Sequence, residues 1–383
     1  MTVAEILANE ELRQHEFPVT AHKIFLAHAG VCPLPMRVAE AVARYASGCV
    51  VDDQEAAVPP TMIRDTRQSA AQLIGAQPEE IALVGPTSLG LSLVAAGLPL
   101  RKNDNVVIYF DDYPSNVYPW MALAEKGVEI RMLSTSQLGR IRAKDVLGQV
   151  DENTRLVALA SCHFLSGWRI DINEIGKRLH KRGILFCVDG IQTLGAFPTT
   201  VEHVDFLAAD SHKWLLGPVG AGILYVRKEL QEKLRPAVFG WHNVRSPNFI
   251  AQEPMAFRSD ARRYEAGSHN LLGIAGLHAA LQLVLELGVD DIAAELMRKR
   301  DSLVPALHAK GWETLEAYSP PEHASAILAC RRNGADIAAV HQQLAAANIL
   351  TSLRTDRTGR QYLRLSPHFY NTDAELQRVV EML

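Results

Sequence analysis

The chain has 383 residues, of which 48% are hydrophobic, 21% charged and 7% aromatic, a composition ordinary for a folded globular protein with room for two domains. The net charge of −4 and an isoelectric point near 6.4 argue against a nucleic-acid partner. The five cysteines are scattered and form no CxxC pair, which argues against a disulfide framework or a metal site. The sequence shows no charged-then-apolar leader and no apolar run of membrane-spanning length. We therefore expect a soluble cytoplasmic protein without a membrane partner.

Apolar runs alternate with amphipathic stretches between residues 60 and 226. The runs are nearly continuous in Val, Ile, Leu, Ala and Phe, as in strands covered on both faces. They predict strands at 80–84, 105–110, 128–133, 155–160, 183–189, 204–210 and 221–226. Helical patterns lie between them at 60–76, 87–98, 115–127, 141–150 and 171–182. This alternation predicts an α/β domain with a mostly parallel sheet.

The pattern changes after residue 270. Helices are predicted at 271–288, 290–310, 335–347 and 373–383, with strands at 324–332 and 362–366. The Arg-rich stretch 353–360 is interpreted as a solvated turn. We therefore divide the chain into an N-terminal segment (1–22) that packs with the small domain, a large α/β domain (23–270) and a small α+β domain (271–383).

A lysine stands where burial is expected. In AADSHKWLLGP (208–218), Lys213 lies between two apolar runs, and burying its amine lowers its pKa. Asp189 ends the strand at 183–189, and ligands bind beyond the carboxyl ends of such strands, so both could face one crevice. A structural Asp–Lys pair accounts for both residues. Pyridoxal 5'-phosphate accounts for them better, because its aldehyde needs a lysine amine and its ring nitrogen an acidic partner.

Other strand ends suit the same cofactor. GPTSLGLSLVAAG (85–97) places Thr87 and Ser88 at the start of a helix, where free N–H groups would hold a phosphate, although both are also ordinary N-cap residues. His212 and Ser211 could add phosphate contacts. Tyr113, after the strand 105–110, could stack on the ring or simply cap the next helix.

Eight segments in order resemble the class V aminotransferase family, which shares the fold-type I pyridoxal phosphate architecture and includes cysteine desulfurases, selenocysteine lyases, kynureninase and isopenicillin N epimerase-like proteins. The segments are FLAHAGVCPLP, GPTSLGLSLV, YPSNVYPW, SCHFLSGWRIDI, VDGIQTLGAFP, SHKWLLGPVGAGILYV, RRYEAGSHN and YLRLSPHFYNT. The resemblance implies a large domain with a mostly parallel mixed sheet, a smaller α+β domain, and a homodimer with shared active sites.

The resemblance also implies residue roles. Lys213 would form the internal aldimine and move the α-proton, with Asp189 on the ring nitrogen and Tyr113 over the ring. Further cofactor contacts would come from Thr87, Ser88, Ser211 and His212 at the phosphate, Gln192 at the phenolic oxygen, and Ser268 at the phosphate of a neighbouring subunit. The substrate carboxylate would bind Arg364. Weaker substrate-side candidates are Asn116 and the backbone of Ala29 and Gly30.

Three features depart from the family's sulfur-transferring members. Desulfurases carry a nucleophilic cysteine in this region, but here the sequence LTSLRTDRTGRQYLR contains none. Cys330 lies in an apolar, strand-like run and is expected to be a core residue. Tyr113 stands where those enzymes place a histidine, and a phenol is a poor acid–base group at neutral pH. Asp210 stands near the expected phosphate and should point away from it. Cys32 is expected to be a packed thiol.

The predicted function is a pyridoxal phosphate enzyme acting at the α-carbon of a small amino acid, in the first place an aminotransferase. A β-lyase or epimerase is the alternative, and kynureninase-like hydrolysis is less supported. A non-catalytic metabolite binder would not need Lys213, Asp189 and Arg364 together. The substrate side chain is expected to meet the loop 239–249, Tyr113 and two histidines, His163 and His269.

Overall fold

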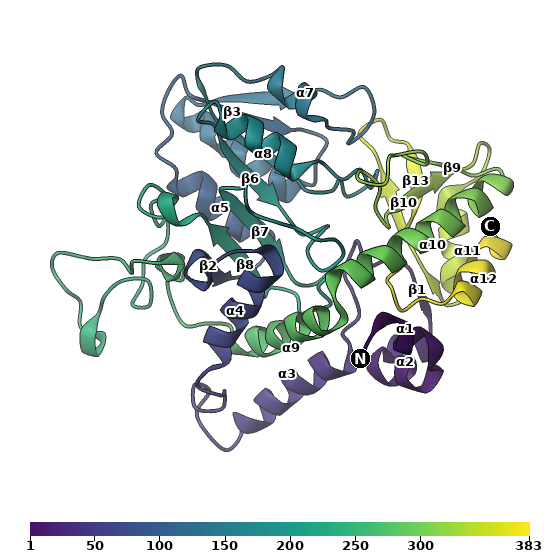
Figure 1. Cartoon of the computed structure of the whole chain (residues 1–383), viewed down its shortest axis with the longest axis horizontal. Coiled ribbons are helices and arrows are strands. Elements are labelled where there is room, and N and C mark those ends of the chain that lie inside the picture. The colour runs from purple at the N-terminus through teal and green to yellow at the C-terminus, as the bar shows by residue number, and fades with distance from the viewer.

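A computed structural model describes all 383 residues. Its main body is a seven-stranded sheet in the order β2-β8-β7-β6-β5-β3-β4 (Figure 1). The strands are β2 (Ile81–Val84), β3 (Asn105–Tyr109), β4 (Glu129–Leu133), β5 (Thr154–Ala160), β6 (Leu185–Asp189), β7 (Phe206–Asp210) and β8 (Gly222–Val226). β8 runs antiparallel to both β2 and β7, and the other pairs are parallel. The predicted strands and the mostly parallel α/β sheet are confirmed.

Helices cover both faces of this sheet, which explains the nearly continuous apolar runs. Val107 packs in one apolar cluster with α4 (Met62–Ile74), α8 (Ile172–His180) and α9 (Leu271–Leu287). Its neighbours Val106 and Ile108 pack in a second cluster with α5 (Thr87–Gly97). The predicted helix at 141–150 shrinks to α7 (Ala143–Leu147).

The helix predicted at 115–127 is wrong as a single element. The chain forms a 3₁₀ turn (Pro114–Asn116), a one-turn helix α6 (Tyr118–Met121) and a second 3₁₀ turn (Ala122–Lys126). Pro114 and Pro119 supply no backbone N–H, so a continuous helical ladder cannot form across this segment.

The smaller sheet has the order β12-β13-β10-β9 and is antiparallel. Its strands are β9 (Glu313–Thr314), β10 (Leu328–Arg331), β12 (Ser352–Thr355) and β13 (Gln361–Leu365), covered by α10 (Val289–Ala309), α11 (Ile337–Ala346) and α12 (Asp373–Met382). The interpretation of 353–360 as a turn is therefore wrong for its first half, because β12 pairs with β13 up to Thr355. Only 356–360 turn, around the Asp356 carboxylate, which accepts hydrogen bonds from Thr358 and Arg360.

The N-terminal region contacts both parts of the molecule. It contains α1 (Val3–Ala8), α2 (Glu10–Glu16) and, further on, α3 (Met36–Gly48). Arg13 pairs with Glu375 at the start of α12 at 2.8 Å, while the Met1 ammonium pairs with Glu286 of α9 at 2.9 Å. Between α2 and α3 in the sequence, β1 (Ile24–Phe25) runs parallel to β11 (Ile349–Leu350).

The long helices join the two parts. α9 packs against α3 and α4 beside the large sheet, and α10 leads across to the small one (Figure 1). No single helix is long and apolar enough to span a membrane, and α9 and α10 reach that length only as a pair bent by 77°. The division of the chain at residues 22 and 270 stays a proposal.

Candidate active site

A cavity of about 250 Å³ lies at the carboxyl ends of β6 and β7, facing the hairpin β12–β13. The large domain supplies its floor, from the start of α5 and the segments after β3, β5, β6 and β7. The small sheet supplies one wall, and the segment after β1 supplies another. Predicted site residues that line it are Ala29, Gly30, Thr87, Ser88, Tyr113, Asp189, Gln192, His212, Lys213 and Arg364.

Lys213 is the reactive amine of this cavity. Its side chain is buried, and its Nζ lies 5.3 Å from the centroid of the Tyr113 ring. Burial lowers the Lys213 pKa to about 8; Asp189 opposes this effect, whereas Arg364 and Arg354 add to it. About a tenth of the amine is therefore uncharged at pH 7, far more than for an ordinary lysine.

Asp189 is a buried carboxylate with few partners. Its Oδ1 accepts a hydrogen bond from the Ile191 N–H at 3.1 Å, and burial raises its pKa to about 6 despite Ile191 and Lys213. Burial and the charge of Asp189 also raise the pKa of Asp112, to about 7. Asp112 accepts hydrogen bonds from Asn116 and from the N–H groups of Tyr113 and Ala160, whereas Asp189, the one of the two that lines the cavity, accepts only the bond from Ile191. Asp189 therefore favours a cationic ligand group, as a protonated ring nitrogen would be.

The start of α5 offers an anion site. Pro86 precedes the helix without a side-chain cap, so the first N–H groups of the helix, from Thr87 and Ser88, have no helical acceptor. The Thr87 Oγ1 accepts from the Asp210 N–H at 2.9 Å, which ties this helix to the end of β7. Nearby, Nδ1 of His212 lies 2.8 Å from the Asp210 carboxylate, which is buried outside the cavity. The helix terminus and His212 line the same cavity, so both offer hydrogen-bond donors to a phosphate there.

Gln192 and the segment after β1 form the wall opposite α5. The Gln192 amide donates to the Ala29 carbonyl at 3.1 Å and accepts from the Trp214 indole at 2.9 Å, which leaves one amide hydrogen for a ligand. A Cβ at Gly30 would lie 3.1 Å from the Ala27 carbonyl oxygen, which is a tight contact, and 3.6 Å from Nη2 of Arg364, which is an ordinary van der Waals distance. This backbone therefore passes directly beside the guanidinium.

Arg364, on β13, is a buried cation without an anion. Its side chain is 1% exposed; it donates to the Phe164 carbonyl at 2.6 Å and to the Ser352 hydroxyl at 3.4 Å, and its Nε has no partner. Burial, assisted by the charge of Arg354, lowers its pKa to about 9. Because an unpaired buried charge is costly, this arrangement fits a carboxylate supplied by a ligand.

Two predicted site residues lie in the protein interior instead. Asn116 donates to Asp112 at 3.0 Å and accepts from the Trp120 indole at 3.0 Å, because the 3₁₀ turn directs it inward. It therefore supports Asp112 rather than a substrate. The Ser211 hydroxyl is buried and donates to the Pro218 carbonyl at 2.8 Å. Neither side chain reaches the cavity.

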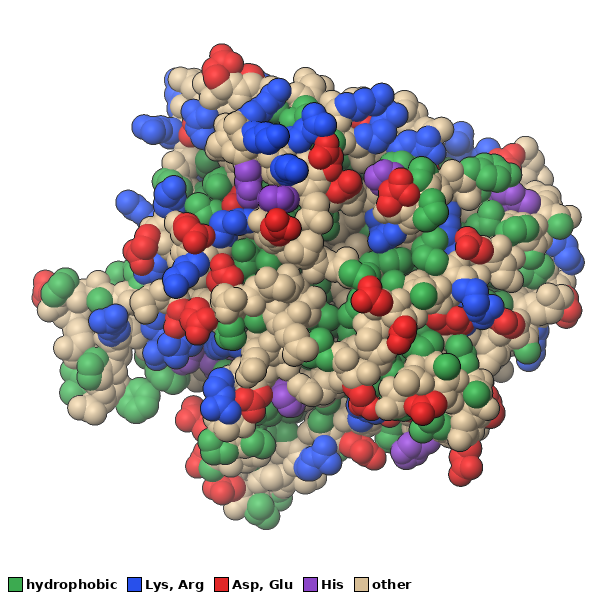
Figure 2. Space-filling view, viewed as in Figure 1, with side chains coloured by type: hydrophobic (Ala, Val, Ile, Leu, Met, Phe, Trp, Pro, Cys, Tyr) green, Lys and Arg blue, Asp and Glu red, His purple; other side chains and the backbone are tan.

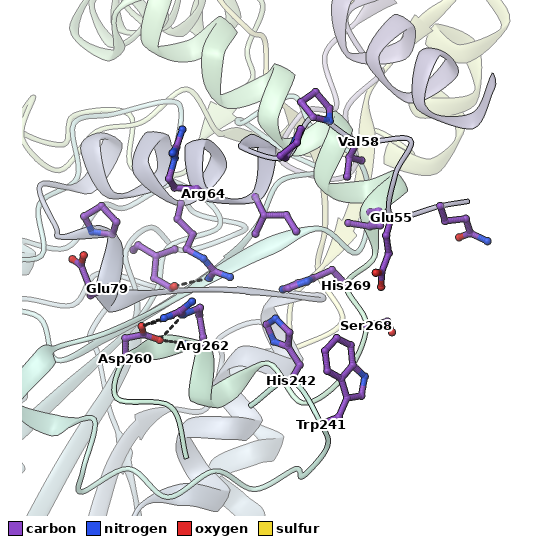
Figure 3. A pocket seen from close by; sticks show the side chains of 18 residues that line it. Glu55, Val58, Arg64, Glu79, Trp241, His242, Asp260, Arg262, Ser268 and His269 are labelled. Atoms are coloured by element: carbon purple, nitrogen blue, oxygen red, sulfur yellow. Dashed lines mark hydrogen bonds and ion pairs between the residues drawn. The ribbon is translucent and has the colours of Figure 1, made fainter. Parts of the chain in front are cut away.

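Ser268 lies elsewhere, exposed at the mouth of a separate surface cavity of about 690 Å³ (Figure 3). Trp241, His242 and His269 line this second cavity as well, so the loop 239–249 and His269 do not border Lys213 in this chain. His163, also expected near the substrate, is buried and contacts Ser166 and the Asp111 carbonyl. Of the groups expected to meet the substrate side chain, Tyr113 lines the cavity, whereas the loop 239–249, His163 and His269 do not.

The sequence interpretation missed several cavity residues, of which Arg354 on β12 is charged. The others are Val31, Pro86, Ser115, Phe164 and Ile191. The signal for Arg354 was present, since polar Ser352 and Arg354 alternate with apolar Leu353 as in a half-buried strand. None of the five cysteines lines the cavity.

The chain is similar to known proteins along most of its length. The family model described as "Aminotransferase class-V" matches residues 24–379. A "Probable cysteine desulfurase" of Methanothermobacter thermautotrophicus is 28% identical over 98% of each chain, and an "Uncharacterized aminotransferase YcbU" of Bacillus subtilis is 29% identical over 82% of this chain and 81% of that one.

Solved structures show the same fold. A cysteine desulfurase from Thermococcus onnurineus NA1 in its apo form superposes with a TM-score of 0.88, at 22% identity over 97% of this chain and 96% of that one. The cystine C–S lyase C-DES, in complex with its product cysteine persulfide, superposes with a TM-score of 0.85, at 22% identity over 95% of this chain and 98% of that one. The predicted fold-type I architecture is confirmed.

Proposed function

The chain belongs to the class-V aminotransferase family of pyridoxal phosphate enzymes, and from that premise we propose that it cleaves a carbon–sulfur bond of a small amino acid bound through Arg364. Family membership confirms the predicted cofactor. The type of reaction needs a separate argument. We place the lyase ahead of the aminotransferase because the relatives include enzymes named cysteine desulfurase and a cystine C–S lyase.

The residues of the cavity fit the cofactor. When bound, pyridoxal phosphate supplies an electron sink for the α-carbon of an amino acid. Lys213 offers the amine for its aldehyde, and Asp189 the buried carboxylate for its ring nitrogen. The α5 terminus with Thr87 and Ser88 offers N–H groups for its phosphate. The single observation that carries the proposal is that the amine, the buried carboxylate and the helix terminus all line one small cavity.

Three side chains of the cavity have separate roles in the proposed reaction. Arg364 holds the substrate carboxylate and so fixes which α-carbon bond faces Lys213. The Lys213 Nζ takes the α-proton and can return it. The Tyr113 ring lines the cavity 5.3 Å from that nitrogen and offers a face on which the cofactor ring can stack. The overall reaction converts an S-substituted cysteine and water into a thiol, pyruvate and ammonium.

The cysteines favour release of the sulfur over transfer to the chain. Burial raises the pKa values of Cys32 and Cys330 to about 12, so both stay protonated, and no thiol borders the cavity. A persulfide on the enzyme would need a thiolate there. The proposal is therefore a C–S lyase whose sulfur leaves with the product.

Product analysis tests the proposal. The enzyme loaded with cofactor is incubated with cysteine and with S-methylcysteine, with and without a 2-oxo acid. We expect a thiol or sulfide, pyruvate and ammonium without the acceptor, and no product from Lys213→Ala. Amino transfer that requires the 2-oxo acid, without thiol release, would establish the second candidate, an aminotransferase, which the relative YcbU supports by name.

We further propose a homodimer with shared active sites, and a cytoplasmic location in keeping with five free cysteines. The segment 236–258 projects from the body of the molecule, and hydrophobic side chains gather on it (Figures 1 and 2). The exposed ones include Phe239, Trp241, Phe249 and Ile250. Such a patch favours burial against a second copy, which would bring Ser268 to the neighbour's phosphate. Light scattering of Phe249→Ser and of the unaltered chain tests the dimer.

A further inference from the structure

The cavity contains a second guanidinium that the proposed reaction does not use. Arg354 lies on β12, one strand away from Arg364 on β13, and both line the cavity of Lys213. A Cβ at Gly30 would lie 3.6 Å from Nη2 of Arg364 and 3.8 Å from Nη2 of Arg354. The two cationic groups therefore flank one short piece of backbone at the cavity wall.

Neither guanidinium has a carboxylate partner in the protein. The one hydrogen bond of the Arg354 side chain goes to the Leu353 carbonyl at 3.0 Å, and it forms no ion pair. The contrast on the same hairpin is Arg357, which pairs with Asp111 and packs over the Phe110 ring at 3.9 Å. The hairpin thus satisfies its outer arginine with protein groups and leaves the inner one directed at the cavity.

The charges around the cavity also favour a second anionic group on the ligand. Arg354 and Arg364 repel each other and both repel a protonated Lys213, while Asp189 is the one carboxylate that lines the cavity. A single substrate carboxylate neutralises one guanidinium. A second anionic group would neutralise the other, and arginine binds carboxylates with a planar two-pronged geometry.

We propose that Arg354 recognises a second carboxylate at the far end of the substrate side chain, so that the enzyme prefers amino acids with an acidic side chain over neutral ones. This inference rests on the proposed function for Arg364, which binds the α-carboxylate. Under C–S cleavage, the second carboxylate is carried by the substituent on sulfur. Arg354 is a specificity-determining residue that takes no part in proton transfer.

Two matched pairs of small molecules test the inference in the cofactor-loaded enzyme. Succinate and butyrate differ by one carboxylate, do not react, and are titrated by calorimetry. S-(2-carboxyethyl)cysteine and S-propylcysteine form a substrate pair, which also differs by one carboxylate but in which a longer chain separates the two carboxylates. We expect the acidic member to be favoured about tenfold or more in Kd and in kcat/KM, the scale of one charge-assisted hydrogen bond.

Variants assign the preference to a residue. Arg354→Gln is expected to abolish the preference for succinate and to leave butyrate affinity within about twofold, and Arg354→Lys to keep part of the preference. Arg364→Gln is expected to weaken both ligands. The control is Arg360→Gln, at an exposed position of the same hairpin outside the cavity. Thermal unfolding of each variant monitors folding.

Contrary outcomes are distinct. Equal weakening of succinate and butyrate by Arg354→Gln would mean that both guanidiniums bind one carboxylate, and the inference would be wrong. Equal binding of the two ligands by the unaltered enzyme would also overturn it. Absence of thiol release, with the succinate preference intact, would refute C–S cleavage and leave the inference standing.

Discussion

Loading of the cofactor onto Lys213 has a predicted pH dependence. The Lys213 pKa is lowered from an ordinary 10.5 to about 8, mainly by burial. The uncharged amine is the nucleophile, so the loading rate should rise about tenfold per pH unit below 8 and level off above it. Relative to an ordinary lysine, the uncharged fraction at pH 7 is larger by about 300-fold, which is the shift expressed as a ratio.

The assay mixes cofactor-free enzyme with pyridoxal phosphate and follows the visible absorption of the bound form. A soluble lysine analogue, measured in parallel, corrects for titration of the cofactor itself. Arg364→Met removes a neighbouring positive charge, so the plateau should begin at higher pH and loading at pH 7 should slow. A rate that keeps rising up to pH 10 would show that Lys213 is not desolvated, and the reasoning would fail.

Further predictions concern the site and its support. Asp189→Asn should keep its fold, within a few degrees of Tm, but lose about 100-fold or more in kcat because an amide cannot hold a protonated ring nitrogen; kinetics within tenfold of the unaltered enzyme would contradict this. Burial raises the pKa of Glu265, but hydrogen bonds from His269 and Arg67 outweigh it and lower that pKa to about 2. Its stabilising effect is therefore full above its ordinary pKa of 4.5 and is lost as pH falls toward 2. Glu265→Gln should lower the free energy of unfolding by about 3–5 kcal/mol in urea at neutral pH, and a loss below 1 kcal/mol would refute the pairing. A thiol reagent should modify Cys49 alone in the native protein, since the other four cysteines are buried; faster reaction elsewhere would contradict the burial.

Much of the sheet was predictable because one physical cause controls it. Strands buried on both faces must be apolar along their length, so residues such as Val106 and Val107 stand out without knowledge of the fold. Lys213 and Asp189 were predictable for the opposite reason, since charged groups at the ends of such strands need a partner. The polarity of each residue and its position relative to the strands were enough to predict the buried strands and these two site residues.

The parts that were missed depend on how the chain turns and pairs in three dimensions. Asn116 looked available for a substrate, and only the packed Trp120 and Asp112 reveal that its amide is already bonded. Arg354 was assigned to a solvated turn although its polarity alternates with that of Leu353, and only the pairing of β12 with β13 places it at the cavity. Ser268 was assigned from the family resemblance alone, and it lines a separate cavity in the chain.

The origin of the cavity walls has a consequence for synthesis. The Ala29 N–H bonds to the Ser366 hydroxyl at 3.1 Å, across 337 positions of sequence. During synthesis Asp189 and Lys213 are made before Arg364. Because domains form in order of emergence, the surface that accepts the cofactor precedes the wall that chooses the substrate. The wall that binds the substrate is therefore completed after the surface that accepts the cofactor.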